Sequence, residues 1–211
     1  MTDRPVDPAA SRGLDGRPTD IASGGGVPEW LAASINYCSR CGGELVFGEI
    51  PGEERHRLGC RSCGFVTYVN PRLVVTTLPV TDAGELVLLR RGIPPGVGSW
   101  AQPGGFLEVD ETVTEAARRE TLEETGLVIE LGGIIGLYSR LEAAVVVIAF
   151  EARIVAGEPR TSPESLEVRS FAAAEIPWDG IAFNTTYWAV VDWLARHHPE
   201  LRPGPAPSMA H

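Results

Sequence analysis

One segment of 23 residues, GFLEVDETVTEAARRETLEETGL at positions 105–127, constrains this chain more than any other. It places Glu120, Glu123 and Glu124 within about one turn of a predicted helix, on one face. Like charges so placed repel by about 0.2–0.5 kcal/mol per pair, and carboxylates near a helix C-terminus also oppose its dipole. A solvated Glu-rich face is the ordinary alternative. A bound divalent cation explains the cluster better, because Mg²⁺ takes carboxylates and substrate phosphates as ligands.

Signals at both ends define this helix. Thr112 with Glu115 three residues later forms a capping-box pattern, and Gly126 suits the left-handed residue that ends a helix. Upstream, Gly104 and Gly105 follow Pro103 and predict a tight turn in which the backbone can approach a ligand closely. Gly104 and Gly105 are therefore candidate substrate-binding positions.

The segment resembles, position for position, the Nudix box G-x5-E-x7-R-E-U-x-E-E-x-G-U, where U is a bulky apolar residue. One position departs from it, because Thr121 stands where an aliphatic residue is usual. The resemblance implies an α/β protein with the Nudix fold, a mixed curved β-sheet sandwiched between helices. It also implies a hydrolase of nucleoside diphosphates linked to another group, with Mg²⁺ or Mn²⁺ as the catalytic cofactor.

The resemblance also assigns roles within the box. Glutamates of its core bind the metal in that family, and the implied ligands and catalytic residues are Glu120 and Glu124, then Glu123. The Gly104 carbonyl is a candidate backbone ligand. Arg119 and Glu111 are similar to the internal ion pair that orients the loop and the helix in the family, which gives both a supporting role.

Further candidates lie outside the box. Arg90 and Arg91 end a predicted strand, where a guanidinium could bind substrate phosphates bidentately, and an exposed strand-end charge is the alternative. Glu167 resembles the glutamate that many family members add as a further metal ligand or general base, and Glu164 competes for that role. Trp100 precedes the box, where similar proteins have a tryptophan packed under the loop, so we expect it to be structural.

The four cysteines of the chain form a second constellation. Cys38 and Cys41, then Cys60 and Cys63, make two C-x2-C knuckles with the spacing of a tetrahedral zinc ribbon. A catalytic zinc keeps an open position, whereas four thiolates close the coordination shell, so we expect structural Zn²⁺. His56 could replace a ligand, although an exposed polar role suits its charged surroundings better.

Composition, the cysteine spacing and the resemblance together divide the chain into four expected parts. These are a disordered leader, a zinc ribbon, a Nudix hydrolase domain and a disordered tail, at residues 1–33, 34–69, 70–200 and 201–211. Within the third part, alternating and apolar runs predict strands at 73–80, 85–89, 128–138, 144–154 and 166–171, with a last helix at 184–197.

Charge and hydropathy exclude some classes of partner. The net charge of -10 argues against tight non-specific binding to nucleic acid, but it permits a nucleotide held through a metal. The longest apolar run, at 143–150, is too short to span a bilayer, and no signal-peptide core is present. We expect a cytoplasmic enzyme that acts on a nucleotide-type small molecule. We expect no membrane partner, and nucleic acid is disfavoured as a partner.

The pairing of a ribbon with a Nudix-like region resembles two groups of enzymes. PESLEVRSFAAAEIPWDGIAF at 163–183 is similar to plant-type ADP-ribose and FAD pyrophosphatases. GLYSRLEAAVVVIAF at 136–150 stands where the NADH pyrophosphatases have an SQPWPFPxS signature, which disfavours NADH. The resemblance therefore implies cleavage of ADP-ribose or FAD with release of AMP.

Two alternatives stay open. One is an NADH or NAD-cap pyrophosphatase, acting on NADH or on capped RNA, and the other is a non-catalytic Nudix-like regulator that senses a nucleotide. An RNA-directed role would use the ribbon's four arginines, but four glutamates offset them: Arg40, Arg55, Arg57 and Arg61 against Glu44, Glu49, Glu53 and Glu54. We therefore expect the ribbon to be structural or to form a homodimer.

Overall fold

The computed structural model describes residues 31 and 33–207, which divide into two compact units between Asn70 and Pro71. This division lies one residue from the domain boundary expected from the sequence. The leader expected at 1–33 lies outside the described residues except for 31 and 33, and so do positions 208–211 of the expected tail.

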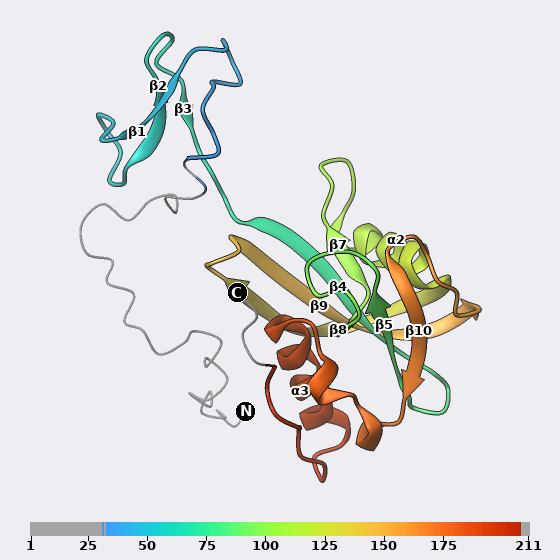
Figure 1. Cartoon of the computed structure of the whole chain (residues 1–211). Coiled ribbons are helices and arrows are strands. Elements are labelled where there is room, and N and C mark those ends of the chain that lie inside the picture. The colour runs from blue at the N-terminus through green and yellow to red at the C-terminus, as the bar shows by residue number, and fades with distance from the viewer. Residues whose placement is uncertain (1–30, 32, 208–211) are drawn as a thin grey trace, which may run out of the picture. The chain divides into compact units, whose positions relative to one another are not determined.

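The first unit is a small antiparallel sheet in the order β1-β2-β3 (Figure 1). Its strands are β1 (Leu45–Gly48), β2 (Arg57–Cys60) and β3 (Val66–Thr67). Its core is built around the knuckles, since Cys38 and Cys60 are buried together with Leu45 and Leu58. So small a core leaves little apolar area to stabilise the unit, and a structural metal is the usual remedy.

The second unit is built on a mixed sheet in the order β10-β5-β4-β9-β8, in which only the β4–β9 pair is parallel. The strands are β4 (Arg72–Val80), β5 (Leu86–Arg91), β8 (Leu127–Arg140), β9 (Val145–Gly157) and β10 (Ser165–Phe171). Two short strands extend it: β6 (Trp100–Ala101) pairs with β5, and β7 (Gly104–Phe106) pairs with β4.

One long helix packs on each face of this sheet (Figure 1). On β9, the neighbouring residues Ala149 and Phe150 point to opposite faces, as strand geometry requires. Phe150 packs with the helix α2 (Val113–Thr125), and Ala149 packs in the cluster of the helix α3 (Asn184–His197). Two 3-10 turns, Ala173–Glu175 and Trp178–Gly180, connect β10 to α3. The mixed sheet between helices predicted from the sequence is confirmed.

The chain stays attached to the second unit beyond residue 200. Leu201 packs against the core cluster of α3, and the Tyr187 hydroxyl donates to the Gly204 carbonyl at 3.1 Å. A side chain at Gly204 would lie within 2.4 Å of the Trp178 side chain, so the backbone passes directly over that ring. The sequence suggested disorder from 201, because Pro and Gly dominate this stretch, but aromatic side chains of the domain hold its first residues.

Candidate active site and zinc site

The carboxylates of the first motif lie at the end of α2, which begins and ends as the sequence predicts. The Thr112 side chain accepts the N–H of Glu115, whose carboxylate accepts the Thr112 N–H, and together they form a complete capping box. At the other end Gly126 is left-handed, with a φ of 75°, and its N–H binds the Leu122 carbonyl. Glu120, Glu123 and Glu124 therefore occupy the last two turns.

Glu124 is the most buried of these carboxylates, with 8% of its surface exposed. Burial raises its pKa to about 7, although the Gly104 N–H, which donates to Oε2 at 2.8 Å, opposes this shift. Gly104 has a φ of 151°, and a Cβ there would lie 2.2 Å from the Val75 carbonyl oxygen, so only glycine fits. Its N–H orients Glu124, a contact that the sequence prediction of a carbonyl ligand did not include.

Glu120 faces the turn that carries the next glycine. A Cβ built on Gly105 would lie 2.5 Å from the Glu120 carboxyl group, so the absence of a side chain at 105 makes room for that carboxylate. Burial is also the largest cause that raises the pKa of Glu120, with Glu123 and Glu164 adding to it. The site thus brings two carboxylates with restricted solvent access close together, a donor set that suits a hard divalent cation.

Arg119 connects four groups of the site. Its guanidinium contacts Glu111 at 2.6 Å, Glu120 at 2.7 Å and Glu123 at 3.1 Å, and it donates to the Phe106 carbonyl at 3.3 Å. The predicted Arg119–Glu111 ion pair is confirmed, and the two contacts with box glutamates are additional. Arg119 is the largest cause that lowers the pKa of Glu111, which falls to about 2.

Glu164 and Glu167 have different neighbours. The negative charge of Glu164 raises the pKa of both Glu120 and Glu124. Glu167 is opposite Arg90 in the β10–β5 register, and its carboxylate lies 3.8 Å from the guanidinium of that residue. A register shift between Ser165 and Glu167 separates the two glutamates.

The two arginines predicted to bind phosphates, Arg90 and Arg91, contact the loop that follows β5. Arg90 Nε donates to the Gly98 carbonyl at 2.8 Å, and Arg91 Nε donates to the Pro95 carbonyl at 2.7 Å. The Arg91 guanidinium also lies over the Phe183 ring, 4.9 Å from its centroid. Desolvation is the main cause that lowers the pKa of Arg91, while Glu124 and Glu164 oppose it, which places Arg91 beside the carboxylates.

Two residues noted in the sequence are explained by packing. Trp100 packs edge-on against Phe171, with centroids 4.9 Å apart, as expected for a structural residue. Thr121, the one departure from the box, is fully buried and lies 2.7 Å from the Thr77 hydroxyl of β4. Thr121 donates its own proton to the Ala117 carbonyl at 2.7 Å, so Thr77 is the donor in the pair.

The four cysteines come together in the first unit. Their Sγ atoms all lie within 4.8 Å of one another, with Cys38 and Cys63 3.9 Å apart and Cys41 and Cys60 3.5 Å apart. Tetrahedral zinc with Zn–S bonds of about 2.3 Å requires sulfur separations of about 3.8 Å, so the cluster fits this metal. Backbone N–H groups of Cys63 and Ser62 help to lower the pKa of Cys60 to about 6, which favours the thiolate that zinc needs.

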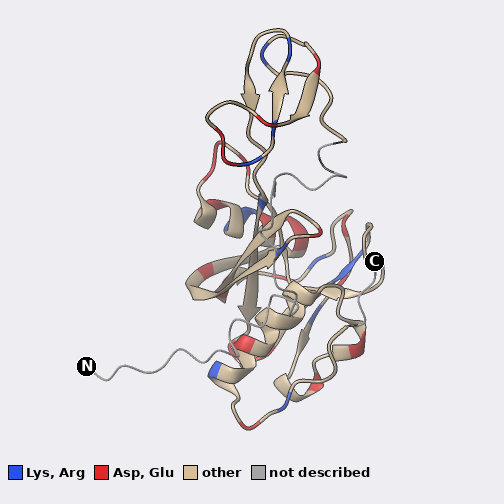
Figure 2. Ribbon diagram, turned by 90° about the vertical axis from the view of Figure 1, so that its left-hand side faces the viewer, with Lys and Arg blue, Asp and Glu red and all other residues tan. Residues whose placement is uncertain are grey.

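Charge on the ribbon does not favour nucleic acid. Figure 2 shows acidic and basic residues interspersed over this unit. Arg57 pairs with Glu53 at 3.2 Å, and Arg61 lies 3.9 Å from Glu44. His56, the weaker ligand candidate, lies 3.9 Å from Glu49 and outside the cysteine cluster.

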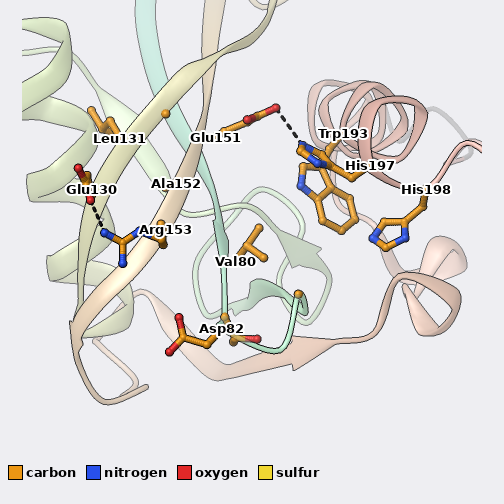
Figure 3. Close-up of a pocket in the computed structure, with 13 residues that line it drawn as sticks. Val80, Asp82, Glu130, Leu131, Glu151, Ala152, Arg153, Trp193, His197 and His198 are labelled. Atoms are coloured by element: carbon orange, nitrogen blue, oxygen red, sulfur yellow. Dashed lines mark hydrogen bonds and ion pairs between the residues drawn. The ribbon is translucent and has the colours of Figure 1, made fainter.

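A large groove of about 920 Å³ lies elsewhere on the second unit (Figure 3). Its lining comes from β4, β8, β9 and the end of α3, and none of the box glutamates contributes to it. Charged groups there pair with one another: His197 lies 3.1 Å from Glu151, and Arg153 pairs with Glu130. Within the described part of the chain, no helix has the length and apolar character needed to cross a membrane.

Comparisons with known families match both units. A family model described as NUDIX domain matches residues 70–194, and one described as Nudix N-terminal, a zinc ribbon, matches residues 36–69. A crystal structure of a NUDIX hydrolase from Nitrosomonas europaea is similar over 82% of this chain and 97% of its own, at 32% identity and a TM-score of 0.72.

Curated relatives match about half of the chain. An ADP-ribose pyrophosphatase of Methanocaldococcus jannaschii is 32% identical over 52% of this chain and 67% of its own length. A NAD-capped RNA hydrolase NudC of Haemophilus influenzae is 30% identical over 44% of this chain and 34% of its own. Nudix hydrolase 19 of Arabidopsis thaliana is 34% identical over 51% of this chain and 23% of its own.

Proposed function

The chain belongs to the Nudix hydrolase family, and from that premise we propose that it hydrolyses the pyrophosphate bond of a nucleoside diphosphate linked to a second group. ADP-ribose and FAD are the favoured substrates, and AMP is one product. One observation carries the proposal: Glu124 is buried without a full counter-charge, and Glu120 and Glu164 lie close enough to raise its pKa. Such a site gains stability from a divalent cation and from the phosphates that the cation binds.

In this proposal the carboxylates of the site have separate roles. Glu120 and Glu124 would hold Mg²⁺ or Mn²⁺, with Glu123, which pairs with Arg119, as a further candidate ligand. When bound, the cation lowers the pKa of the attacking water and neutralises charge on the phosphate oxygens. Glu164 accepts the proton of that water during in-line attack on phosphorus, and the Gly104 N–H keeps Glu124 oriented.

Arg119 has a supporting role in this scheme. It stays paired with Glu111 and so fixes the loop before α2 against the helix. Arg90 and Arg91 hold the loop of residues 92–99 beside the carboxylates, and through that loop they shape the substrate site. The ribbon serves as a structural zinc domain in this scheme, and a cytoplasmic location would keep its thiolates available for the metal.

Similarity to NudC proteins favours a second candidate substrate, NADH or NAD-capped RNA. These relatives therefore suggest two groups of substrate, ADP-ribose on one side and NADH or NAD-capped RNA on the other, and both contain a pyrophosphate attached to an adenosine. The paired charges of the ribbon weigh against RNA, so ADP-ribose and FAD come first.

The test incubates the purified full chain with Mg²⁺ or Mn²⁺ and ADP-ribose, FAD, NADH, nucleoside triphosphates or capped RNA, and separates the products by chromatography. We expect metal-dependent release of AMP from ADP-ribose or FAD. Glu124→Gln should lose this activity and keep its fold, because the amide oxygen can still accept the Gly104 N–H. Binding of these nucleotides without turnover would instead make the protein a nucleotide sensor.

A further inference from the structure

The hydroxyl of Ser165 joins the end of α2 to the turn that carries Glu164. Ser165 is the first residue of β10 and is only 3% exposed. Its Oγ donates to the carbonyl oxygen of Glu124 at 2.9 Å and accepts the N–H of Ser162 at 2.8 Å. A buried hydroxyl with both a donor and an acceptor contact is held in one rotamer.

Two hydrogen bonds fix the backbone of Glu164, one within its own turn and one to the loop after β5. Its N–H donates to the Ser162 hydroxyl at 3.1 Å, and its carbonyl accepts the Gly92 N–H at 2.7 Å. A Cβ on Gly92 would lie 3.2 Å from the Glu164 carbonyl group, so the two backbones are in close contact. The exposed Glu164 side chain therefore extends from a turn whose backbone is held in place by hydrogen bonds.

The Ser165 hydroxyl binds the backbone of a proposed metal ligand. It donates to the carbonyl oxygen of Glu124, and the charge of Glu164 acts on the carboxyl group of the same residue. A second tether, from the Arg160 N–H to the Thr125 carbonyl at 2.8 Å, anchors the start of the same turn. Beside this backbone tether, the Ser165 hydroxyl is a side chain that joins the Glu164 turn to the Glu124 backbone.

We propose that Ser165 is a positioning residue for the hydrolysis, acting through Glu164: its hydroxyl ties the turn that carries Glu164 to the backbone of Glu124 at the end of α2. The inference rests on the proposed function, in which Glu164 accepts the proton of the attacking water. A catalytic base displaced by a fraction of an ångström still permits substrate binding, because the other carboxylates and the glycine turn are untouched. The effect should therefore fall on kcat and not on KM.

The test is a double-mutant cycle on the full chain with Ser165→Ala, Glu164→Gln and both together. We expect Ser165→Ala to lower kcat about tenfold with KM within about twofold, and Glu164→Gln to lower kcat about a hundredfold or more. In the Glu164→Gln background, Ser165→Ala should change kcat by less than about twofold, because the group it positions is gone. Ser165→Thr, which keeps the hydroxyl, should recover most of the activity.

Ser170→Ala is the matched control. Ser170 lies on the same strand and donates to Glu85 at 2.6 Å, so its variant loses a similar hydrogen bond at a distance from the carboxylates. Its kcat should equal that of the wild type, and the unfolding temperature of every variant should be recorded. An equal loss of kcat from Ser165→Ala with and without Glu164 would overturn the proposal, as would a change confined to KM.

A second readout does not depend on turnover. The charge of Glu164 adds to the field at Glu120 and Glu124, so Mn²⁺ affinity, measured by electron paramagnetic resonance, should fall in Glu164→Gln and in Ser165→Ala. The double variant should bind Mn²⁺ no more weakly than Glu164→Gln alone. If the wild type hydrolyses none of the substrates, the proposed function fails, while additive losses of Mn²⁺ affinity would overturn the positioning role separately.

Discussion

Replacing Glu124 by Gln should stabilise the metal-free protein, and the gain should grow with pH. The pKa of Glu124 is about 7 in the folded chain against 4.5 for an unperturbed glutamate, and burial is the main cause. Between these two values the folded state keeps a proton that the unfolded state has lost, so the free energy of unfolding falls as pH rises. Above pH 7 the ionised carboxylate remains buried, and the full penalty applies.

The size of the effect follows from the difference between the two pKa values. At about 1.4 kcal/mol per pH unit, the penalty removed by Gln at pH 8 is about 3 kcal/mol, and at pH 5 it is below about 1 kcal/mol. The Gln amide nitrogen needs an acceptor that the carboxylate did not, which reduces the gain by about 1 kcal/mol. We therefore expect Glu124→Gln to be more stable than the wild type by about 2 kcal/mol at pH 8.

Urea unfolding followed by tryptophan fluorescence at pH 5 and pH 8, in buffer without Mg²⁺ or Mn²⁺, measures this difference. Four of the five tryptophans lie in the second unit and report on it: Trp100, Trp178, Trp188 and Trp193. Glu123→Gln is the control, since it removes the same charge from a side chain that is 59% exposed, and it should change stability by less than about 0.5 kcal/mol at either pH. An equal gain from Glu124→Gln at both pH values, or a loss at pH 8, would refute the reasoning.

Three further predictions concern the two proposed metal sites and the Arg119–Glu111 ion pair. Cys41→Ser should reduce the zinc content measured by mass spectrometry from one ion per chain to near none, since three thiolates leave the tetrahedron open. Arg119→Gln should return the pKa of Glu111 towards 4.5. In the wild type, the stability due to this ion pair is present above pH 4.5 and is lost as pH falls towards 2. The free energy of unfolding of the variant, measured by acid titration, should therefore lack this decrease. Gly105→Ala should weaken Mn²⁺ binding about tenfold or more in calorimetry, because the added Cβ displaces the Glu120 carboxylate, and unchanged affinity would show that this carboxylate is no ligand.

Much of the fold follows from local signals in the sequence. The capping box at Thr112, the left-handed Gly126 and the alternation of apolar residues set the ends of α2 and the strands within a few residues. The cysteine spacing likewise predicts a cluster that the structure brings together. These features were predictable because each depends on residues that are close in sequence.

The remaining features of the site depend on contacts between distant segments. Glu164 and Glu167 are three residues apart and chemically alike, and the register of β10 on β5 decides that Glu167 meets Arg90. Arg91 carries a charge suited to phosphates, but its Nε is taken by a carbonyl of the loop that follows. Neither the strand register nor the path of a loop is encoded in a local pattern, so the sequence could supply the candidates and not the choice among them.

The buried hydroxyl pair of Thr77 and Thr121 bears on how this protein could have diverged from its relatives. Changing Thr121 alone to the usual aliphatic residue would leave the Thr77 hydroxyl buried without its acceptor, at a cost of about 1–3 kcal/mol. Changing both removes the polar groups together and costs little. The two positions, Thr77 on β4 and Thr121 on α2, should therefore change together among homologues.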